Sequence, residues 1–320
     1  SSMLSASCVA FDWRTSSLRL WVADKKGNIL NTTNGPYGMS LLKPFEYEKV
    51  LEEALQNVGV ASAAPVIISG MAGSAQGWCE APYLSTPTQL DRLVEKSVRV
   101  DNRHRQVHIL PGVKQKKPAD VMRGEETQIA GFLTVHPQFD GVVCLPGTHT
   151  KWVRLSAKEI VSFRTFMTGE LFSLLSKQSV LKHCVADQGW SEPDFLEAVD
   201  DAISSPQQLS ARLFGLRAEG LINDMPAAVA RARLSGYLIG LELSGAKAYW
   251  LGQDLVAIGA PKLSKLYALA LKSQGLSCRV LRGDDMTLEG LRSVTRLCRR
   301  RVDEPKYYRH SARRSSMRSG

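Results

Sequence analysis

Long apolar runs are missing from this chain of 320 residues. No window reaches the roughly 18 uninterrupted apolar residues of a membrane-spanning helix, and no basic segment followed by an apolar one opens the chain like a signal peptide. We therefore expect a cytoplasmic protein with no membrane partner. Apolar residues still make up 44% of the chain, which is enough for a large core, and the length favours two lobes over one.

Cysteine is scarce, and its spacing shows none of the pairs typical of a zinc site or a disulfide framework. Most of the cysteines lie in apolar runs, which indicates reduced core residues in a cytosolic protein. The six are Cys8, Cys79, Cys144, Cys184, Cys278 and Cys298.

Positive charge exceeds negative charge, and it is unevenly placed. Residues 299–320 hold eight Arg or Lys and two Asp or Glu, so they carry +6 of the net charge of +10. This Ser/Arg-rich stretch lacks apolar periodicity, and we expect residues 301–320 to form a disordered, solvated tail rather than an arm that binds polyanions. The high isoelectric point is therefore weak evidence for nucleic acid as a partner.

Two adjacent carboxylates stand out near the middle of the chain. Glu125 and Glu126 follow a glycine and precede an apolar, helix-compatible run. A strand-like run at 142–145 then leads into a turn of small and hydroxyl residues at 146–150. A carboxylate suits proton abstraction, and a Gly/Thr turn after a buried strand can offer backbone N–H groups to a phosphate. Together they indicate phosphoryl transfer to a hydroxyl group.

A strand–turn–strand pattern occurs twice in the sequence. Residues 8–22 have this pattern, with a third strand expected at 28–33, and residues 9–15 align with residues 142–148. Two such units suggest a duplicated lobe in which each copy aims one turn at a shared cleft. Chance similarity between two β-hairpins is the alternative, and the alternation of residues leaves it open.

The rest of the chain alternates strands with helices, which is typical of an α/β protein. A small-residue loop at 70–74 follows a buried strand, at the sheet edge where α/β proteins usually bind ligands. A basic loop is expected at 114–118, and Thr168 is the expected N-cap of a helix. Further strands are expected at 65–69, 107–110, 160–164, 255–260 and 277–281, and helices at 45–58, 127–133, 171–176, 193–217, 227–249, 261–273 and 284–297.

Six groups of motifs point the same way when their order and spacing are taken together. They lie at 12–19, 70–84, 122–128, 146–153, 163–171 and 259–267. In this order they resemble the 2-dehydro-3-deoxygalactonokinase family, within the actin/hexokinase/Hsp70-like ATPase superfamily. The resemblance covers roughly residues 8–297 and leaves out the tail.

The resemblance implies an α/β fold of two ribonuclease-H-like lobes with a cleft between them. Residues 1–135 would form the N-terminal lobe, with a first phosphate loop and the substrate pocket. Residues 136–300 would form the C-terminal lobe, with a second phosphate loop and an adenosine pocket. The implied activity is ATP-dependent phosphorylation of 2-dehydro-3-deoxy-D-galactonate at its terminal hydroxyl, giving the 6-phosphate, in D-galactonate catabolism. ATP and Mg²⁺ would be the cofactors, and a homo-oligomer is left open.

The resemblance also implies roles for individual residues. Glu125 takes the position of the general base, with Glu126 as the alternative, and Asp12 would hold Mg²⁺ through water. The residues implied for ATP and its phosphates are Asp12, Arg14, Thr15, Ser16, Gly147, Thr148, His149, Gly259 and Ala260. Those predicted for the substrate are Gly73, Ser74, Trp78, Arg123, Arg164, Thr168 and Glu170. Because the sugar acid is an anion, Arg123, Arg164 and Lys151 are candidate counter-charges, with surface or interlobe salt bridges as the alternative for Arg123 and Lys151.

One position departs from the family pattern. The family usually has glycine where this chain has Arg14, and the second copy of the motif does have one, Gly147. Glycine would permit a positive φ and a close approach of the backbone to phosphate. Arginine could block that approach or supply a cation to the phosphates, and the sequence leaves both open. If arginine blocks the approach, the chain would be a non-catalytic relative that binds sugar acid or nucleotide.

Overall fold

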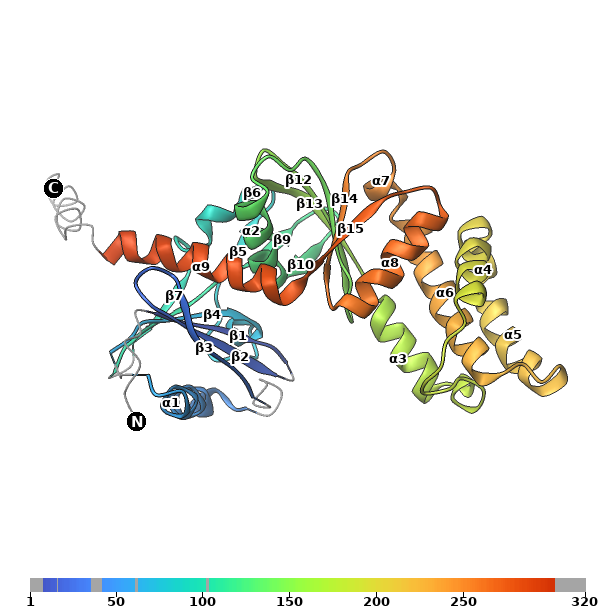
Figure 1. Cartoon of the computed structure of the whole chain (residues 1–320), viewed down its shortest axis with the longest axis horizontal. Helices are drawn as coiled ribbons and strands as arrows, with labels where there is room; N and C mark the ends of the chain where they lie inside the picture. The colour runs from blue at the N-terminus through green and yellow to red at the C-terminus, as the bar shows by residue number, and fades with distance from the viewer. Residues whose placement is uncertain (1–7, 16, 36–41, 61–62, 102–103, 303–320) are drawn as a thin grey trace, which may run out of the picture. The chain divides into compact units, whose positions relative to one another are not determined.

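The structure is a computed structural model of the chain and describes residues 8–15, 17–35, 42–60, 63–101 and 104–302. Contacts divide the chain into two compact units, each described by itself here (Figure 1). Unit 1 comprises Ser1–Pro82, Asp91–Pro111 and Leu288–Gly320, and unit 2 comprises Tyr83–Leu90 and Gly112–Thr287.

Residues 112–135 group with unit 2 by contacts, whereas the sequence assigned them to a lobe of residues 1–135. The lobe boundary and the cleft therefore stay predictions. Ser16 and residues 303–320, which include nearly all of the expected tail, lie outside the described residues.

Unit 1 is built around a six-stranded sheet of order β3-β2-β1-β4-β8-β7. The expected meander is confirmed, because β1 pairs antiparallel with β2, and β2 pairs antiparallel with β3. Parallel pairing then joins β1 to β4 and β4 to β8. The strands are β1 (Cys8–Trp13), β2 (Leu18–Ala23), β3 (Ile29–Gly35), β4 (Val66–Gly70), β7 (Val98–Asp101) and β8 (Gln106–Ile109).

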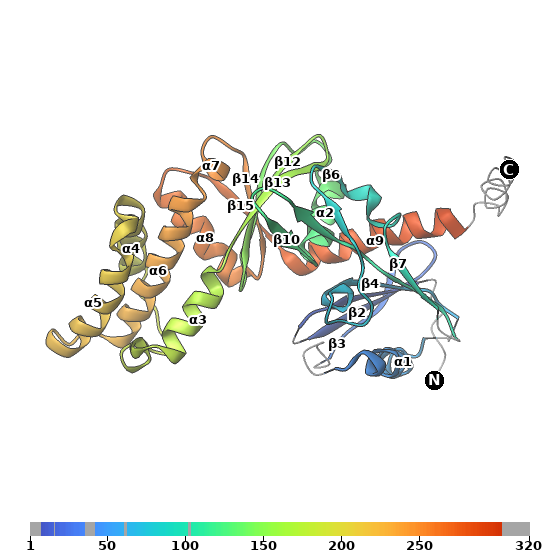
Figure 2. The ribbon, with the colours of Figure 1, turned by 180° about the vertical axis from the view of Figure 1, so that it is seen from behind.

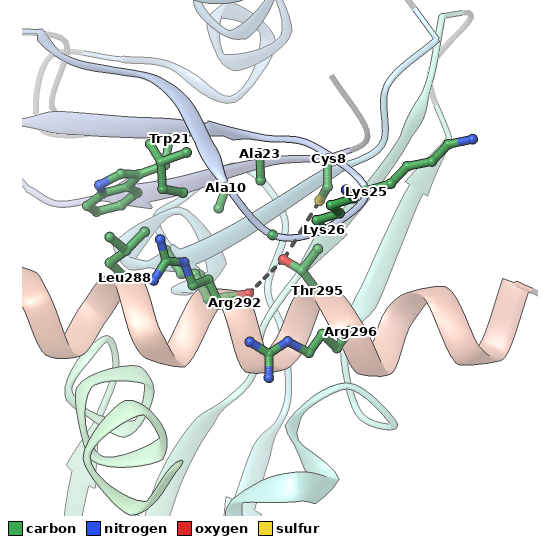
Figure 3. A pocket seen from close by; sticks show the side chains of 13 residues that line it. Cys8, Ala10, Trp21, Ala23, Lys25, Lys26, Leu288, Arg292, Thr295 and Arg296 are labelled. Carbon is green, nitrogen blue, oxygen red and sulfur yellow. Dashed lines mark hydrogen bonds between the residues drawn. The ribbon is translucent and has the colours of Figure 1, made fainter. Parts of the chain in front are cut away.

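The two faces of this sheet are covered by different helices. Alternate residues of β1, such as Phe11 and Trp13, join the core cluster that includes Leu51 and Leu55 of α1 (Tyr47–Asn57), as the period of two in a strand requires. Helix α9 (Gly283–Val302) covers the other face, where Cys8 and Thr295 are in contact. A cavity of about 270 Å³ remains between this face and α9 (Figure 3).

Unit 2 repeats the same topology. Its main sheet has the order β15-β14-β11-β12-β13-β6, in which β11, β12 and β13 form an antiparallel meander. Parallel pairing joins β11 to β14 and β14 to β15, as in unit 1. Chance similarity of two hairpins would not extend to the parallel strands, so the duplication is confirmed. The strands are β6 (Thr88–Gln89), β11 (Gly141–Leu145), β12 (Thr150–Ser156), β13 (Glu159–Phe166), β14 (Leu255–Gly259) and β15 (Cys278–Arg282).

A small three-stranded sheet in unit 2 was not expected. It consists of β5 (Tyr83–Ser85), β9 (Gly112–Gln115) and β10 (Asp120–Met122). The basic loop predicted at 114–118 is therefore wrong at its start, because Lys114 and Gln115 belong to β9. Gln115 explains the difference: its side chain donates to the Phe163 carbonyl and accepts from the Phe163 amide, which ties this edge to β13.

The helices of unit 2 follow the predicted segments closely. Figures 1 and 2 show α4, α5 and α6 side by side, and the small residues Gly236 and Gly240 allow α6 to approach the backbone of α4. The α-helices are α2 (Glu125–Val135), α3 (Thr168–Gln178), α4 (Glu192–Ser204), α5 (Leu209–Ile222), α6 (Ala227–Gly245), α7 (Lys247–Trp250) and α8 (Pro261–Ser273). Short 3-10 helices lie at Pro44–Glu46, Met71–Gly73, Leu90–Leu93, Val180–His183 and Pro206–Gln208.

The cysteines that the structure describes are free thiols, as expected for a reduced protein. Cys8 and Cys144 are buried, and burial raises the pKa of the Cys144 thiol well above its usual value. None of the described helices is long and apolar enough to cross a membrane.

Candidate active site

Asp12 marks the end of β1 in unit 1. Its side chain is buried and accepts a hydrogen bond from Arg14 Nε at 2.8 Å. Arg14 itself is exposed, and its amide N–H closes the hairpin on the Ser17 carbonyl. Thr15 is exposed beside it. The first predicted phosphate turn is thus a tight hairpin whose carboxylate is held by its own neighbour.

Backbone strain is not what distinguishes Arg14 from Gly147. Neither residue is among the positive-φ residues of the described chain. The positive φ that glycine would permit is therefore not used at either position. The difference between the two turns lies in side-chain charge and bulk.

The second loop of unit 1 is shaped by Gly70. This residue ends β4 with φ at +98°, and a Cβ there would lie 2.6 Å from the Trp13 carbonyl oxygen. Such a contact with backbone is not tolerated, so only glycine brings the 70–74 loop this close to the end of β1. Parallel strands end at one sheet edge, and the loop accordingly begins beside Asp12.

Three predicted substrate residues lie in this loop or shortly after it, and they have different neighbours. Gly73 and Ser74 are buried, and the Ser74 hydroxyl donates to the Met71 carbonyl at 2.7 Å. Trp78 stacks on Tyr47 with ring centroids 6.0 Å apart and contacts Trp13 edge-on. These rings belong to the core of unit 1, so packing accounts for much of what Trp78 does.

Glu125 and Glu126 begin α2 in unit 2, and each accepts a backbone N–H from the preceding turn. The Glu125 carboxylate accepts from the Arg123 amide at 3.1 Å, and that of Glu126 from the Gly124 amide at 2.6 Å. Carboxylates are favoured in a first helical turn, where N–H groups lack partners inside the helix. The side chains then diverge: Glu125 is 28% exposed and Glu126 is fully buried.

Glu126 has the more perturbed titration of the two. Burial and the neighbouring charge of Glu125 raise the pKa of Glu126 from 4.5 to about 8. One of its oxygens, Oε1, has no hydrogen-bond partner within the described part of the chain. At neutral pH Glu126 is therefore mostly protonated.

Lys151 joins Glu125 to the second phosphate turn. Its Nζ lies 3.9 Å from Glu125 Oε1 and donates to Thr165 Oγ1 at 3.1 Å. Asp120 holds Thr165 in place by accepting from both its hydroxyl and its amide at 2.7 Å. No role was assigned to Asp120 or Thr165 from the sequence, although Thr165 lies in the motif at 163–171.

The second phosphate turn rests on the start of α3. Glu170 donates its amide N–H to the Thr148 carbonyl at 2.9 Å, and its carboxylate contacts His149 Nε2 at 2.8 Å. Gly169 packs directly against the turn, since a Cβ there would lie 2.3 Å from the Gly147 oxygen. Three residues assigned to phosphate and one assigned to substrate are therefore in mutual contact.

A Gly169→Ala variant should show how tightly this contact is packed. The new Cβ would meet the backbone of Gly147 and Thr148, which cannot move aside like a flexible side chain. We expect the free energy of unfolding to fall by about 1–3 kcal/mol or more, measured by chemical denaturation. Gly147→Ala is the matched control, because its Cβ would meet only the His149 oxygen at 3.8 Å. Equal losses in the two variants would contradict this packing.

The predicted adenosine turn lies where three parallel strands end. Gly259 closes β14, and a Cβ there would lie 3.2 Å from the Pro146 oxygen after β11. A Cβ on Gly283, which follows β15, would likewise lie 3.2 Å from the Cα of Gly259. Ala260 is exposed and precedes Pro261, which begins α8 as expected. The turn thus neighbours the second phosphate turn within unit 2.

Other predicted substrate residues are not gathered at these turns. Arg164 is exposed on β13, and Arg123 lies over the Tyr83 ring at 4.5 Å. Thr168 is not an N-cap, because Met167 takes that position and no side-chain cap bond forms. The Thr168 hydroxyl instead donates to Glu242, a buried carboxylate that the sequence did not single out.

Glu242 lies on α6 and accepts hydrogen bonds from several elements. Tyr267 Oη of α8 donates to Oε1 at 2.7 Å, and Trp152 Nε1 of β12 donates to Oε2 at 2.8 Å. Burial raises the pKa of Glu242 to about 7, and these hydrogen bonds, with that of Thr168, oppose the shift. A glutamate inside an apolar, Gly-rich helix pattern was the signal that could have found it.

Mg²⁺ would find one suitable protein ligand in unit 1. Among the described residues, no group of three or more His, Cys, Asp or Glu side chains could hold a metal by themselves. Mg²⁺ needs only one or two protein carboxylates when waters and phosphates complete its octahedral shell. The buried Asp12 carboxylate, an oxygen ligand at the end of β1, fits that requirement.

The cavity in unit 1 lies apart from these residues. Figure 3 shows it between α9 and the strand face that carries Cys8, Ala10 and Trp21. None of the described residues that the sequence assigned to the site lines it. We therefore place the candidate site at the strand-end turns and not in the cavity.

The paired topology and the strand-end turns define a class of protein. Two ribonuclease-H-like sheets of this order make up the fold of actin-like ATPases and of the sugar kinases that share it. The activator of 2-hydroxyisocaproyl-CoA dehydratase from Clostridium difficile, solved with ADPNP bound, has this fold in common with the chain at a TM-score of 0.51 and 10% identity.

A narrower relationship follows from comparison of the whole sequence. The model of the 2-keto-3-deoxy-galactonokinase family matches residues 12–294, and the chain belongs to this family. The "Probable 2-dehydro-3-deoxygalactonokinase DgoK1" of Rhizobium meliloti (strain 1021) is 39% identical over 293 residues, which cover 90% of this chain and 96% of that protein. The 2-dehydro-3-deoxygalactonokinase of Escherichia coli (strain K12) is 31% identical, over 91% and 98%.

A solved structure agrees with this relationship. A crystal structure of a Sinorhizobium meliloti protein, assigned as a 2-dehydro-3-deoxygalactonokinase, superposes with a TM-score of 0.87 at 38% identity. The match covers 91% of this chain and 99% of that one. The family suggested by the motifs is therefore confirmed.

Proposed function

We propose that the chain transfers the γ-phosphoryl group of ATP to the terminal hydroxyl of 2-dehydro-3-deoxy-D-galactonate, giving the 6-phosphate. Membership of the 2-keto-3-deoxy-galactonokinase family supports this substrate class. The observation that carries the proposal is the contact of Glu125 with Lys151, one residue after the turn that would bind phosphate. A base and a phosphate turn this close suit phosphoryl transfer to a hydroxyl.

Glu125 is the proposed general base. Its carboxylate is partly exposed, so a substrate hydroxyl can reach it, whereas Glu126 is fully buried. In the step itself, the hydroxyl oxygen bonds to the γ-phosphorus as its proton passes to Glu125 and the bond from phosphorus to the ADP oxygen breaks. Lys151, whose Nζ is buried beside Glu125, would hold the carboxylate in position through opposite charge.

The phosphates of ATP would meet two sets of groups. Gly147, Thr148 and His149 would receive them in unit 2, with Gly259 and Ala260 next to the adenosine. Asp12, with Arg14 and Thr15, would face them in unit 1, and Asp12 would hold Mg²⁺ through water. The bound ion would neutralise charge on the β- and γ-phosphate oxygens.

The sugar acid carries a carboxylate of its own, and cationic residues are the proposed partners. Arg123 and Arg164 suit bidentate binding of a carboxylate. Arg123 already lies over the Tyr83 ring, which would hold its guanidinium plane in a fixed direction. Gly73, Ser74, Trp78, Thr168 and Glu170 stay proposals for the remainder of the substrate pocket.

A kinase assay tests the proposal. Purified protein, Mg²⁺ and ATP should form ADP only when 2-dehydro-3-deoxygalactonate is added, and a panel of 2-keto-3-deoxy sugar acids should define the preferred stereochemistry. Folded protein that forms no ADP above background with millimolar substrate would sink the proposal. No finding favours a non-catalytic relative, so turnover is the expected result.

The proton on Glu126 gives a stability prediction. The pKa of Glu126 is raised from 4.5 to about 8 in the folded protein. Protonation of Glu126 therefore stabilises the fold fully below pH 4.5, and this stability is lost as the pH rises from 4.5 through 8. Glu126→Gln removes this dependence. We expect the variant to gain stability over the wild type between pH 5 and 8, by about 1.4 kcal/mol per pH unit at most. Chemical denaturation at pH 5 and at pH 8 measures the free energy of unfolding of both proteins. A difference between wild type and variant that is the same at the two pH values would contradict the prediction.

A further inference from the structure

A chain of hydrogen bonds runs from Glu242 to the second phosphate turn. Tyr267 has a single hydroxyl proton, which it donates to Glu242 at 2.7 Å. The hydroxyl pair at 3.0 Å between Thr150 and Tyr267 then has Thr150 as its donor, because the other acceptor for the Thr150 proton, the Gly147 carbonyl, is farther away at 3.5 Å. The Thr150 oxygen is left to accept from the Gly147 amide at 3.3 Å. When Glu242 is ionised its oxygens can only accept, and this fixes the direction of every bond in the chain.

A second set of contacts links Glu242 to the same turn through helix α3. Thr168 donates to Glu242, which fixes the first residue of α3. The next residue, Gly169, packs against the Gly147 oxygen, and Glu170 donates to the Thr148 carbonyl. Glu242 therefore supports the turn through α8 on one side and through α3 on the other.

The backbone N–H groups of the turn fall into two kinds, one that is hydrogen-bonded and two that are not. The N–H of Gly147 is taken by Thr150, as described above. Among the described residues, no partner is found for the N–H groups of Thr148 and His149, and both residues are exposed. Unpartnered backbone N–H groups in a turn are the groups that bind anions.

We propose that Glu242 is the positioning residue of the second phosphate turn. Through Tyr267 and Thr150 it occupies the Gly147 amide, so that the Thr148 and His149 amides are the pair presented to the phosphates of ATP. This rests on the proposed function only in taking the turn to be a phosphate site. A carboxylate is needed because its two oxygens serve three donors; an amide offers one acceptor oxygen and leaves a buried donor unpaired.

Binding of a non-hydrolysable ATP analogue, measured by calorimetry on the full chain, tests the proposal. Tyr267→Phe and Thr150→Val each break one bond of the chain and keep the shape of the side chain. We expect each to weaken analogue binding about tenfold and to leave sugar-acid binding unchanged. Glu242→Gln should weaken analogue binding at least as much.

Tyr249→Phe is the matched control, because it removes a hydroxyl that donates to Ser162 at 3.2 Å and has no link to the turn. It should bind the analogue like the wild type. If Tyr267→Phe and Thr150→Val change only the melting temperature and bind the analogue as the control does, Glu242 is merely structural. These two variants decide the matter even if Glu242→Gln fails to fold.

The outcomes separate this inference from the proposed function. A wild type that binds the analogue but phosphorylates no sugar acid overturns the proposed function, and the variants still test Glu242. A wild type that binds no analogue overturns the role of the turn, and the inference falls with it.

Discussion

Glu125→Gln is expected to lower kcat by about 10²- to 10⁴-fold, the usual contribution of a general base. Glutamine keeps the shape of the side chain and can still accept the Arg123 amide N–H, but it cannot take up the hydroxyl proton. Binding of ATP and of the sugar acid should change little, because the loss lies in the transition state. Steady-state kinetics measure kcat, and calorimetry measures binding.

Glu126→Gln is the matched control for the base. The pKa of Glu126 is raised to about 8, so this side chain is already neutral at pH 7 and an amide resembles it closely. Its buried position also keeps it from substrate. We expect the kcat of this variant to stay within about tenfold of the wild type. Loss of a general base would lower kcat by at least about 10²-fold, so the two cases can be told apart. If Glu126→Gln loses activity and Glu125→Gln keeps it, the base assignment is reversed.

Asp12→Asn is expected to raise the Mg²⁺ concentration needed for half-maximal activity by about 10- to 100-fold, the range typical of groups that act through a bound water. The fold should tolerate the change, since Arg14 is half exposed and water can replace its lost partner. Kinetics across a Mg²⁺ series and calorimetry of ATP analogue binding with and without Mg²⁺ both report the effect.

Arg14→Gly is the comparison variant for Asp12. It removes the cation that lies 2.8 Å from the Asp12 carboxylate and restores the glycine typical of the family. If Arg14 competes with Mg²⁺ for this carboxylate, the variant should need less Mg²⁺ than the wild type. An unchanged Mg²⁺ requirement in Asp12→Asn would show that Asp12 is not the ligand, whatever Arg14→Gly does.

The sequence by itself determined the elements and their order. Apolar runs at 8–22 and 142–156 predicted strands, and the segment 45–58 predicted an amphipathic helix, because local periodicity indicates which face is buried. The repeated meander also suggested a duplication, which the matching parallel strands of the two units then confirmed. The two carboxylates, the glycine-bearing turns and the family could all be recognised from local patterns.

Only the tertiary structure decided how these pieces act together. Glu126 and Glu125 are adjacent and chemically identical, yet Glu126 is buried and mostly protonated at neutral pH, whereas Glu125 is partly exposed beside Lys151. Gly147 carries the motif, but Gly169, 22 positions later, is the glycine that cannot accept a side chain. Glu242 reaches the phosphate turn only through Tyr267 and Thr150. Burial and hydrogen bonding depend on residues far apart in the chain, so no local pattern could have shown them.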